Sequence, residues 1–137
     1  MRTALWPEAP EDHLPECRAY FEADDPESIT IIAVADDAEV CGFIEVGTRP
    51  FAEGCETRPV GYIEGWWVEP GFRLKGVGAA LVTAAESWAA SLGLVEMASD
   101  AELDSTSSRR AHAALGYNEV AEVVCFRKSI GNASRLE

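Results

Sequence analysis

The sequence predicts an α/β fold, with helices layered against a mixed β-sheet. In the second half of the chain, β-rich runs alternate with helical patterns, which is typical of such layers. In the first half, a β-rich run at 29–35 is followed by two aspartates and a returning run at 40–47, which together indicate a hairpin. The 137 residues give enough chain for one hydrophobic core, so we expect a single domain over residues 1–137.

The other elements follow from hydrophobic spacing and from the residues that end helices. The clearest helix is expected over 76–92, where apolar residues recur at steps of three and four and Gly93 follows. A shorter helix over 13–23 is predicted by four apolar residues that share one face, namely Leu14, Cys17, Tyr20 and Phe21. The remaining expected elements are a polar loop at 49–59, strands at 60–68, 94–99 and 120–128, and a helix at 105–115.

The chain is strongly acidic. It carries 24 acidic and 11 basic residues, which gives a net charge of −13. Nucleic acids and anionic membranes require basic surface, so we expect neither as a partner. A cationic small molecule would be attracted by this field. Solubility alone is a competing explanation of the charge.

Cysteine usage and hydropathy favour a cytoplasmic protein. The four cysteines form no C-x-x-C pair, and no histidine lies at zinc-ligand spacing from any of them. No apolar run approaches the length of a membrane span. We therefore expect free thiols, no metal and no membrane association.

A basic, glycine-rich loop precedes the clearest helix. It has the form Arg73-x-x-Gly76-x-Gly78, which matches neither a P-loop nor a dinucleotide fingerprint. The free N–H groups and the dipole of a helix N-terminus can hold a phosphate, and glycines leave room for one. An ordinary strand-to-helix loop is the alternative, and the residues of the loop alone do not decide between the two.

The order of the elements, with this loop between a strand and a helix, resembles the GCN5-related N-acetyltransferase superfamily over roughly residues 29–130. Within that superfamily the chain is similar to the aminoglycoside 6′-N-acetyltransferases. The similarity is carried by five stretches that occur in the same order, Leu5-Trp6-Pro7, Tyr62-Ile63-Glu64-Gly65, Met97-Ala98-Ser99-Asp100-Ala101, Ala114-Leu115-Gly116-Tyr117 and Val123-Val124-Cys125-Phe126-Arg127-Lys128.

The resemblance implies a mostly antiparallel sheet and acetyl-CoA as co-substrate. We expect the usual first strand of the family to be missing, because Trp6 comes almost at once. The implied acetyl-CoA contacts are the strand backbone of Trp66, Trp67 and Val68, the loop residues Leu74, Lys75, Gly76, Val77, Gly78 and Ala79, and Ser105. The implied aminoglycoside contacts are Trp6, Phe51, Glu64 and Asp100. His112 stands where many members carry a tyrosine as general acid, and it could equally be a neutral surface residue.

Acetyl transfer needs an amine that loses a proton, a polarised thioester carbonyl and an in-line approach. We expect Glu64 to take the amine proton and Asp100, at the end of a neighbouring strand, to hold the ammonium group. The strand period of two also predicts that residues 64, 66 and 68 share one face.

The expected function is direct transfer of an acetyl group from acetyl-CoA to the 6′-amino group of an aminoglycoside within a ternary complex, a reaction of antibiotic resistance. Two alternatives stay open at this point: the same chemistry on a polyamine or a protein amine, and a degenerate fold that binds CoA without turnover. Because the missing first strand would expose a sheet edge, we also expect a homodimer.

Overall fold

The computed structural model describes residues 1–131 of the chain. Its elements confirm most of the expected order. They are α1 (Arg2–Leu5), η1 (Pro10–Asp12), α2 (His13–Ala23), β1 (Ser28–Val34), β2 (Val40–Arg49), β3 (Val60–Val68), η2 (Pro70–Phe72), α3 (Val77–Ser91), β4 (Met97–Ser99) and α4 (Thr106–Ala114).

The sheet has four strands in the order β1-β2-β3-β4. The first two pairings are antiparallel, and β3 pairs with β4 in parallel, so the sheet is mixed and mostly antiparallel as predicted. Within residues 1–131 no strand precedes α2. The parallel pairing is short, since it joins only 61–63 of β3 to 97–99 of β4.

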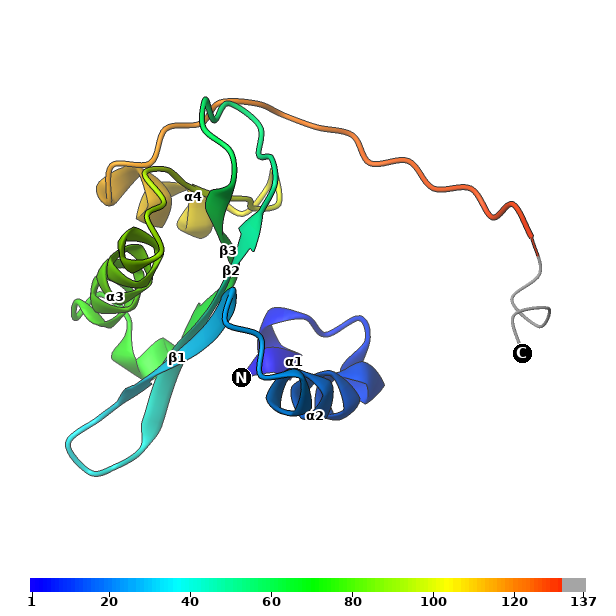
Figure 1. The fold of residues 1–137 in the computed structure, drawn as a ribbon. Coiled ribbons are helices and arrows are strands. Elements are labelled where there is room, and N and C mark those ends of the chain that lie inside the picture. Colours follow the sequence, from blue (N-terminus) through cyan, green and yellow to red (C-terminus); the bar gives the residue numbers. More distant parts are fainter. Residues whose placement is uncertain (132–137) are drawn as a thin grey trace.

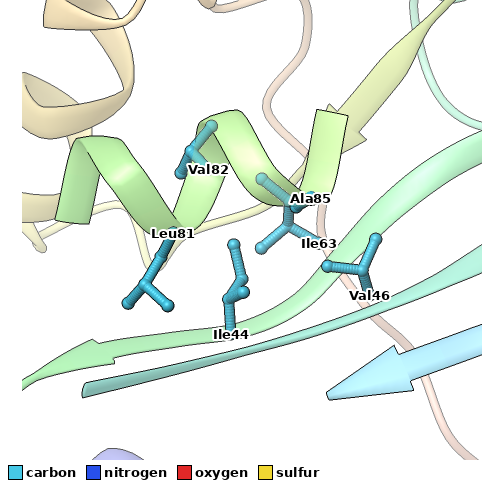
Figure 2. Packing of buried hydrophobic residues seen from close by; sticks show 6 residues of the cluster. All are labelled: Ile44, Val46, Ile63, Leu81, Val82 and Ala85. Carbon is cyan, nitrogen blue, oxygen red and sulfur yellow. The ribbon is translucent and has the colours of Figure 1, made fainter. Parts of the chain in front are cut away.

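The core lies between α3 and one face of the sheet. Apolar side chains of α3 meet those of β2 and β3 there, as Figure 2 shows for Ile44, Val46, Ile63, Leu81, Val82 and Ala85. Burying one side chain of this size contributes about 1.5–3 kcal/mol. An apolar face on the long helix is therefore confirmed and fixes α3 against the strands. Its buried residues are Leu81, Val82, Ala85 and Ala89, whereas Ala84 and Leu92, which were expected on this face, are exposed.

The opposite face of the sheet is covered by α1 and α2 (Figure 1). The α2 residues expected on one face do not all reach the sheet, because Leu14 and Phe21 are exposed. Tyr20 does reach it, and its hydroxyl accepts a hydrogen bond of 3.0 Å from the backbone N–H of Thr30 in β1. The helix thus covers part of the β1 edge with one polar contact.

A bulge in β3 changes which residues face α3. In the pairing with β2, Ile63 lies opposite Val46 and Gly65 lies opposite Glu45, which leaves Glu64 as an extra residue. Trp66 and Val68 consequently pack with Ile63 on the α3 side. The expectation that residues 64, 66 and 68 share one face is wrong, because it assumed an uninterrupted period of two.

The strand predicted at 120–128 is absent from the single chain. After α4 the chain crosses the β2–β3 loop, where Val120 comes against Gly54, and then runs away from the rest of the molecule (Figure 1). Residues 118–131 are exposed and have no regular secondary structure. The residues have strong β-propensity, but a strand also needs a partner, and this path brings them to none.

Glu96 fastens the β2–β3 loop to the sheet just before β4. Its Oε1 accepts hydrogen bonds from the backbone N–H of Thr57 at 2.6 Å, from the Thr57 hydroxyl at 2.5 Å and from the backbone N–H of Glu56 at 2.9 Å. These hydrogen bonds hold the pKa of Glu96 below its usual value, and the bond from the Thr57 side chain has the largest effect.

A group whose pKa is lowered in the folded state contributes stability above its ordinary pKa and loses it as the pH falls through the lowered one. We expect Glu96→Gln to lower the melting temperature at pH 7 and to make the melting temperature less sensitive to pH between 6 and 3. Circular dichroism melts over this range check the prediction, with Glu22→Gln on the exposed surface of α2 as control. Equal pH dependence in the wild type and Glu96→Gln would contradict it.

Candidate active site

An acidic pocket lies on the sheet face opposite α3. It has a volume of about 330 Å³ and is lined by Arg2, Trp6, Glu8, Ala9, His13, Glu16, Glu45 and Glu64. Four of these residues are glutamates and one is an arginine. Such a lining favours a ligand that carries several positive charges.

Trp6 forms one wall of the pocket by packing directly on β3. A Cβ atom at Gly65 would lie 2.3 Å from Cη2 of Trp6, so only glycine permits this approach. The carbonyl of Trp6 also accepts a hydrogen bond of 2.9 Å from Nε2 of His13. The structure thus brings Trp6 and Glu64, both predicted to contact substrate, into the same pocket.

Arg2 holds two of the four pocket carboxylates. Its guanidinium forms ion pairs with Glu16 of α2 and with Glu45 of β2. The Arg2 and Glu45 side chains are 23% and 20% exposed, so their pair is partly shielded from water, whereas Glu16 is 55% exposed and its pair with Arg2 is open to solvent. They join α1, α2 and the sheet, and they neutralise part of the pocket's negative charge.

A second arginine links Glu64 to Asp100. Arg49, the last residue of β2, donates from Nε to Oε1 of Glu64 at 2.8 Å and from Nη2 to Oε2 at 2.7 Å. Its guanidinium carbon lies 3.5 Å from the centre of the Tyr62 ring. The Tyr62 hydroxyl in turn donates to Oδ2 of Asp100 at 2.6 Å. The two predicted catalytic acids are therefore connected through a stacked arginine and a tyrosine.

The environment of this group shifts two pKa values. The hydrogen bonds to Glu64 raise the pKa of Arg49, and the charge of Asp100 adds to the effect. Burial, followed by the hydrogen bond to Asp100, raises the pKa of Tyr62 well above its usual value. Both residues thus keep their protons at any physiological pH.

Phe51 lies apart from the acidic pocket. It is on the β2–β3 loop, partly exposed, with the guanidinium carbon of Arg58 5.0 Å from its ring centre. Phe51 is not among the residues that line the pocket. Its predicted contact with substrate would require a ligand that reaches beyond the pocket.

The end of β3 offers a free strand edge on the β4 side. Pairing with β4 stops at Ile63, whereas β3 continues to Val68. Trp66, Trp67 and Val68 lie on this stretch, as the predicted contact with the arm of acetyl-CoA requires. The carbonyl of Val68 is already bonded to Nε of Arg73 at 2.7 Å, and the Arg73 guanidinium carbon lies 4.6 Å from the centre of the Trp67 ring.

Residues 74–79, which are the end of the loop before α3 and the first three residues of that helix, have free backbone amides. No side chain caps the helix, and the first helical hydrogen bond runs from the N–H of Ala80 to the carbonyl of Gly76. Leu74 and Gly76 both have positive φ, at 60° and 87°. The Lys75 ammonium lies 3.1 Å from the carbonyl of Gly71. The sequence Leu74, Lys75, Gly76, Val77, Gly78 and Ala79 thus forms an uncapped helix entrance suited to an anion.

Gly78 has a second role that the sequence did not indicate. A Cβ atom there would lie 3.0 Å from Cζ2 of Trp66, so the absence of a side chain lets β3 and α3 approach. A substitution of Gly78 would therefore disturb packing as well as any bound phosphate.

His112 on α4 has partners at both ring nitrogens. Nδ1 donates to the carbonyl of Ser108 at 2.7 Å, and Nε2 lies 2.8 Å from the hydroxyl of Ser99. The ring packs edge-on against Trp66, with centroids 5.2 Å apart. With the proton of the neutral ring on Nδ1, Nε2 accepts a hydrogen bond from the Ser99 hydroxyl, so neither ring nitrogen is free to act as general acid in this arrangement. Ser105 is at the start of α4, where its side chain makes no capping hydrogen bond.

Sequence reasoning missed the basic members of the site. Arg2, Arg49 and Tyr62 belong to no motif, and the residues they contact are distant in the sequence. The alternation of Glu45, Gly47 and Arg49 along β2 was the available signal, since it places a charged pair on one face of the strand. Within residues 1–131, no group of three or more histidine, cysteine or acidic side chains could hold a metal ion.

Comparisons with known proteins agree with this architecture. The curated aminoglycoside N(6′)-acetyltransferase type 1 of Klebsiella aerogenes is 44% identical over 132 residues, which cover 95% of this chain and 87% of that protein. The crystal structure of aminoglycoside antibiotic 6′-N-acetyltransferase AAC(6′)-Ih from Acinetobacter baumannii superposes with a TM-score of 0.87 at 35% identity, covering 95% of this chain and 88% of that one. A structure of AAC(6′)-Iy in complex with the bisubstrate analogue CoA-S-monomethyl-acetylneamine gives a TM-score of 0.86 at 37% identity, covering 94% and 87%.

A comparison with the sequence model of a whole protein family agrees with these individual relatives. The sequence model of the acetyltransferase (GNAT) family matches residues 1–117, which include every element from α1 to α4. The chain belongs to the acetyltransferase (GNAT) family.

Proposed function

We propose that this protein transfers the acetyl group of acetyl-CoA to the 6′-amino group of an aminoglycoside, by direct attack in a ternary complex. The observation that carries the proposal is the acidic pocket at Glu64, which lies where β3 and β4 part. Aminoglycosides are polycations, and four glutamates suit them better than they suit a neutral ligand. The names of the relatives at 34–44% identity support the substrate class.

Acetyl-CoA supplies the activated acetyl thioester. The amides from Leu74 to Ala79 would hold its pyrophosphate, because they are the uncapped donors of the α3 entrance. The free edge of β3 at Trp66, Trp67 and Val68 would pair with its extended arm, and Ser105 would contact it at the start of α4. The fit is supported by open space around Gly76, where a Cβ atom would meet nothing within 4 Å.

Glu64 and Asp100 are the proposed catalytic residues. Glu64, on the bulge of β3, would bind the ammonium group and take its proton, directly or through water. Asp100, fixed by the Tyr62 hydroxyl, would hold the amine in line for attack. Trp6 would pack against the sugar rings, and Phe51 would contact substrate beyond the pocket.

We also propose that the active protein is a single domain over residues 1–137 that works in the cytoplasm, where acetyl-CoA is available. All four cysteines are free in the structure, which suits a reducing compartment. None of the helices within residues 1–131 meets the length and hydropathy of a membrane span.

A homodimer is the proposed assembly, with each C-terminal tail lying on the second copy. Residues 118–131 form an extended segment whose apolar side chains face water, and Phe126 is 92% exposed. Exposed apolar chain with unpaired backbone groups is stabilised by joining a sheet edge, and β4 is such an edge. The segment leaves its own body (Figure 1), so a second copy is the occupant that the proposal names.

The pyrophosphate assignment predicts a loss of acetyl-CoA affinity in Lys75→Glu. This change reverses an exposed charge beside the uncapped amides and leaves the packing of Trp66 on Gly78 intact. We expect the Kd for acetyl-CoA to rise about tenfold, or about 1.4 kcal/mol, by calorimetry. Arg18→Glu on the exposed side of α2 makes the same change in net charge and should leave this Kd within twofold. Unaltered affinity in a folded Lys75→Glu protein would sink the assignment.

The proposed roles of the acids predict different kinetic effects. Glu64→Gln should lower kcat by about 10²-fold or more, with a smaller loss at high pH, where the amine deprotonates unaided. Asp100→Asn should raise the aminoglycoside KM more than it lowers kcat. Thiol release from acetyl-CoA with kanamycin, spermidine and a lysine peptide measures both effects and tests the substrate class. If both variants keep full kcat/KM, or if spermidine or the peptide is preferred, the proposed function is wrong.

The dimer predicts that tail substitutions change the oligomeric state. The double variant Val124→Glu and Phe126→Glu should be a monomer at micromolar concentrations at which the wild type is a dimer. A charged side chain in the tail would have to be buried at the dimer interface, which costs free energy. Sedimentation velocity measures this, with Leu14→Glu as the control for an exposed apolar residue outside the tail. A wild-type monomer, or a double variant that remains a dimer, would refute the proposal.

A further inference from the structure

We infer that the Arg49 guanidinium occupies the position which a substrate ammonium group takes against Glu64, and that substrate binding displaces it. Arg49 would then be an internal competitor for the acceptor site and would determine how strongly positive a substrate must be. This inference deepens the proposed function and rests on it, because it treats Glu64 as the carboxylate that receives the amine.

The contacts of Arg49 are those that a cationic amine would make. Its guanidinium bonds both oxygens of Glu64, at 2.8 and 2.7 Å, and lies 3.5 Å above the Tyr62 ring. A carboxylate beside an aromatic face is a favourable site for any ammonium or guanidinium group. The Tyr62 hydroxyl holds Asp100 at the hydroxyl end of the same ring. Arg49 therefore marks a cation site that Glu64, Tyr62 and Asp100 build together.

Arg49 can leave this position at small cost. The Arg49 and Glu64 side chains are 42% and 41% exposed, and Arg49 is the last residue of β2, next to a loop. Pairs this accessible are screened by water, so they are weak in comparison with buried ones. Arg2, the arginine that lines the pocket, is about half as exposed and bridges two glutamates, so it is much less suited to exchange.

In the observed geometry, the Arg49 guanidinium and a substrate ammonium group cannot both bind Glu64 without one of them losing hydrogen bonds. The forked contact with Arg49 uses one good hydrogen-bonding direction of each carboxylate oxygen and covers the side of Glu64 that faces the Tyr62 ring. An ammonium group that enters over Tyr62 must take the same space. The apparent substrate affinity is then reduced by the fraction of protein in which Arg49 holds Glu64.

A fixed structural tie is the competing explanation. In that case Arg49 would orient Glu64 for the substrate, and its removal would weaken binding. The two explanations predict opposite signs for the same substitution, and binding can be measured without turnover.

The experiment is calorimetry of kanamycin binding to the wild type, Arg49→Gln and Arg49→Lys in the presence of CoA. We expect Arg49→Gln to bind kanamycin about fivefold more tightly, which corresponds to about 1 kcal/mol. Arg49→Lys, which keeps the charge but loses the fork, should lie between the two. In the Glu64→Gln background, Arg49→Gln should produce no tightening, because the competition acts through that carboxylate.

Arg18→Gln is the matched control for the loss of one positive charge. Arg18 lies on the exposed side of α2, and within residues 1–131 it forms no ion pair with a carboxylate. Its kanamycin Kd should stay within twofold of the wild-type value. Arg49→Lys keeps the test available if Arg49→Gln does not fold.

The outcomes separate the inference from the function on which it rests. If the wild type acetylates kanamycin but Arg49→Gln and Arg49→Lys bind it equally or more weakly, only the inference is overturned. Equal tightening in Arg18→Gln would also overturn it, because the lower positive charge of the whole protein would then be the cause. If the wild type neither binds nor acetylates kanamycin, both the inference and the proposed function fall.

Discussion

The arrangement of the site depends on the extra residue in β3. A regular strand would alternate without interruption, and Trp66 would then turn away from α3 if Ile63 faced it. The bulge at Glu64 resets the alternation. Ile63, Trp66 and Val68 all pack toward α3, while Glu64 and Gly65 face the acidic pocket. The pocket, the tryptophan packing and the separation of β3 from β4 therefore occur at one point of one strand.

Much of the fold could be predicted from local signals in the sequence. The bounds of α2, β3 and α3 followed from hydrophobic patterning and from Gly93, which can be read from a short stretch of sequence. The strand at 120–128 could not be predicted correctly, because a β-rich segment forms a strand only where a partner edge is available. The bulge was also invisible, since apolar residues occupy β3 on both sides of Glu64.

The site was predictable only in part, for a related reason. Glu64, Asp100 and Trp6 were found through stretches that resemble a family, and the structure brings Trp6 and Glu64 to one pocket. Their basic partners are set by strand register and by helix docking, which single-sequence patterns do not specify. Register places Gly47 opposite Tyr62 and Arg49 opposite Val60, so the long Arg49 side chain reaches the Tyr62 ring diagonally across the two strands.

The pocket is built from two kinds of structure. Glu45 and Glu64 belong to the sheet, whereas Glu8, Glu16 and Trp6 come from the N-terminal segment, which reaches the sheet through Trp6 on Gly65 and the ion pairs of Arg2. Substitutions in that segment can alter the number and spacing of wall charges without touching the strand that carries the chemistry. A protein built this way can acquire a new range of acceptors by drift in one short, peripheral stretch, so its selectivity and its reaction can evolve independently.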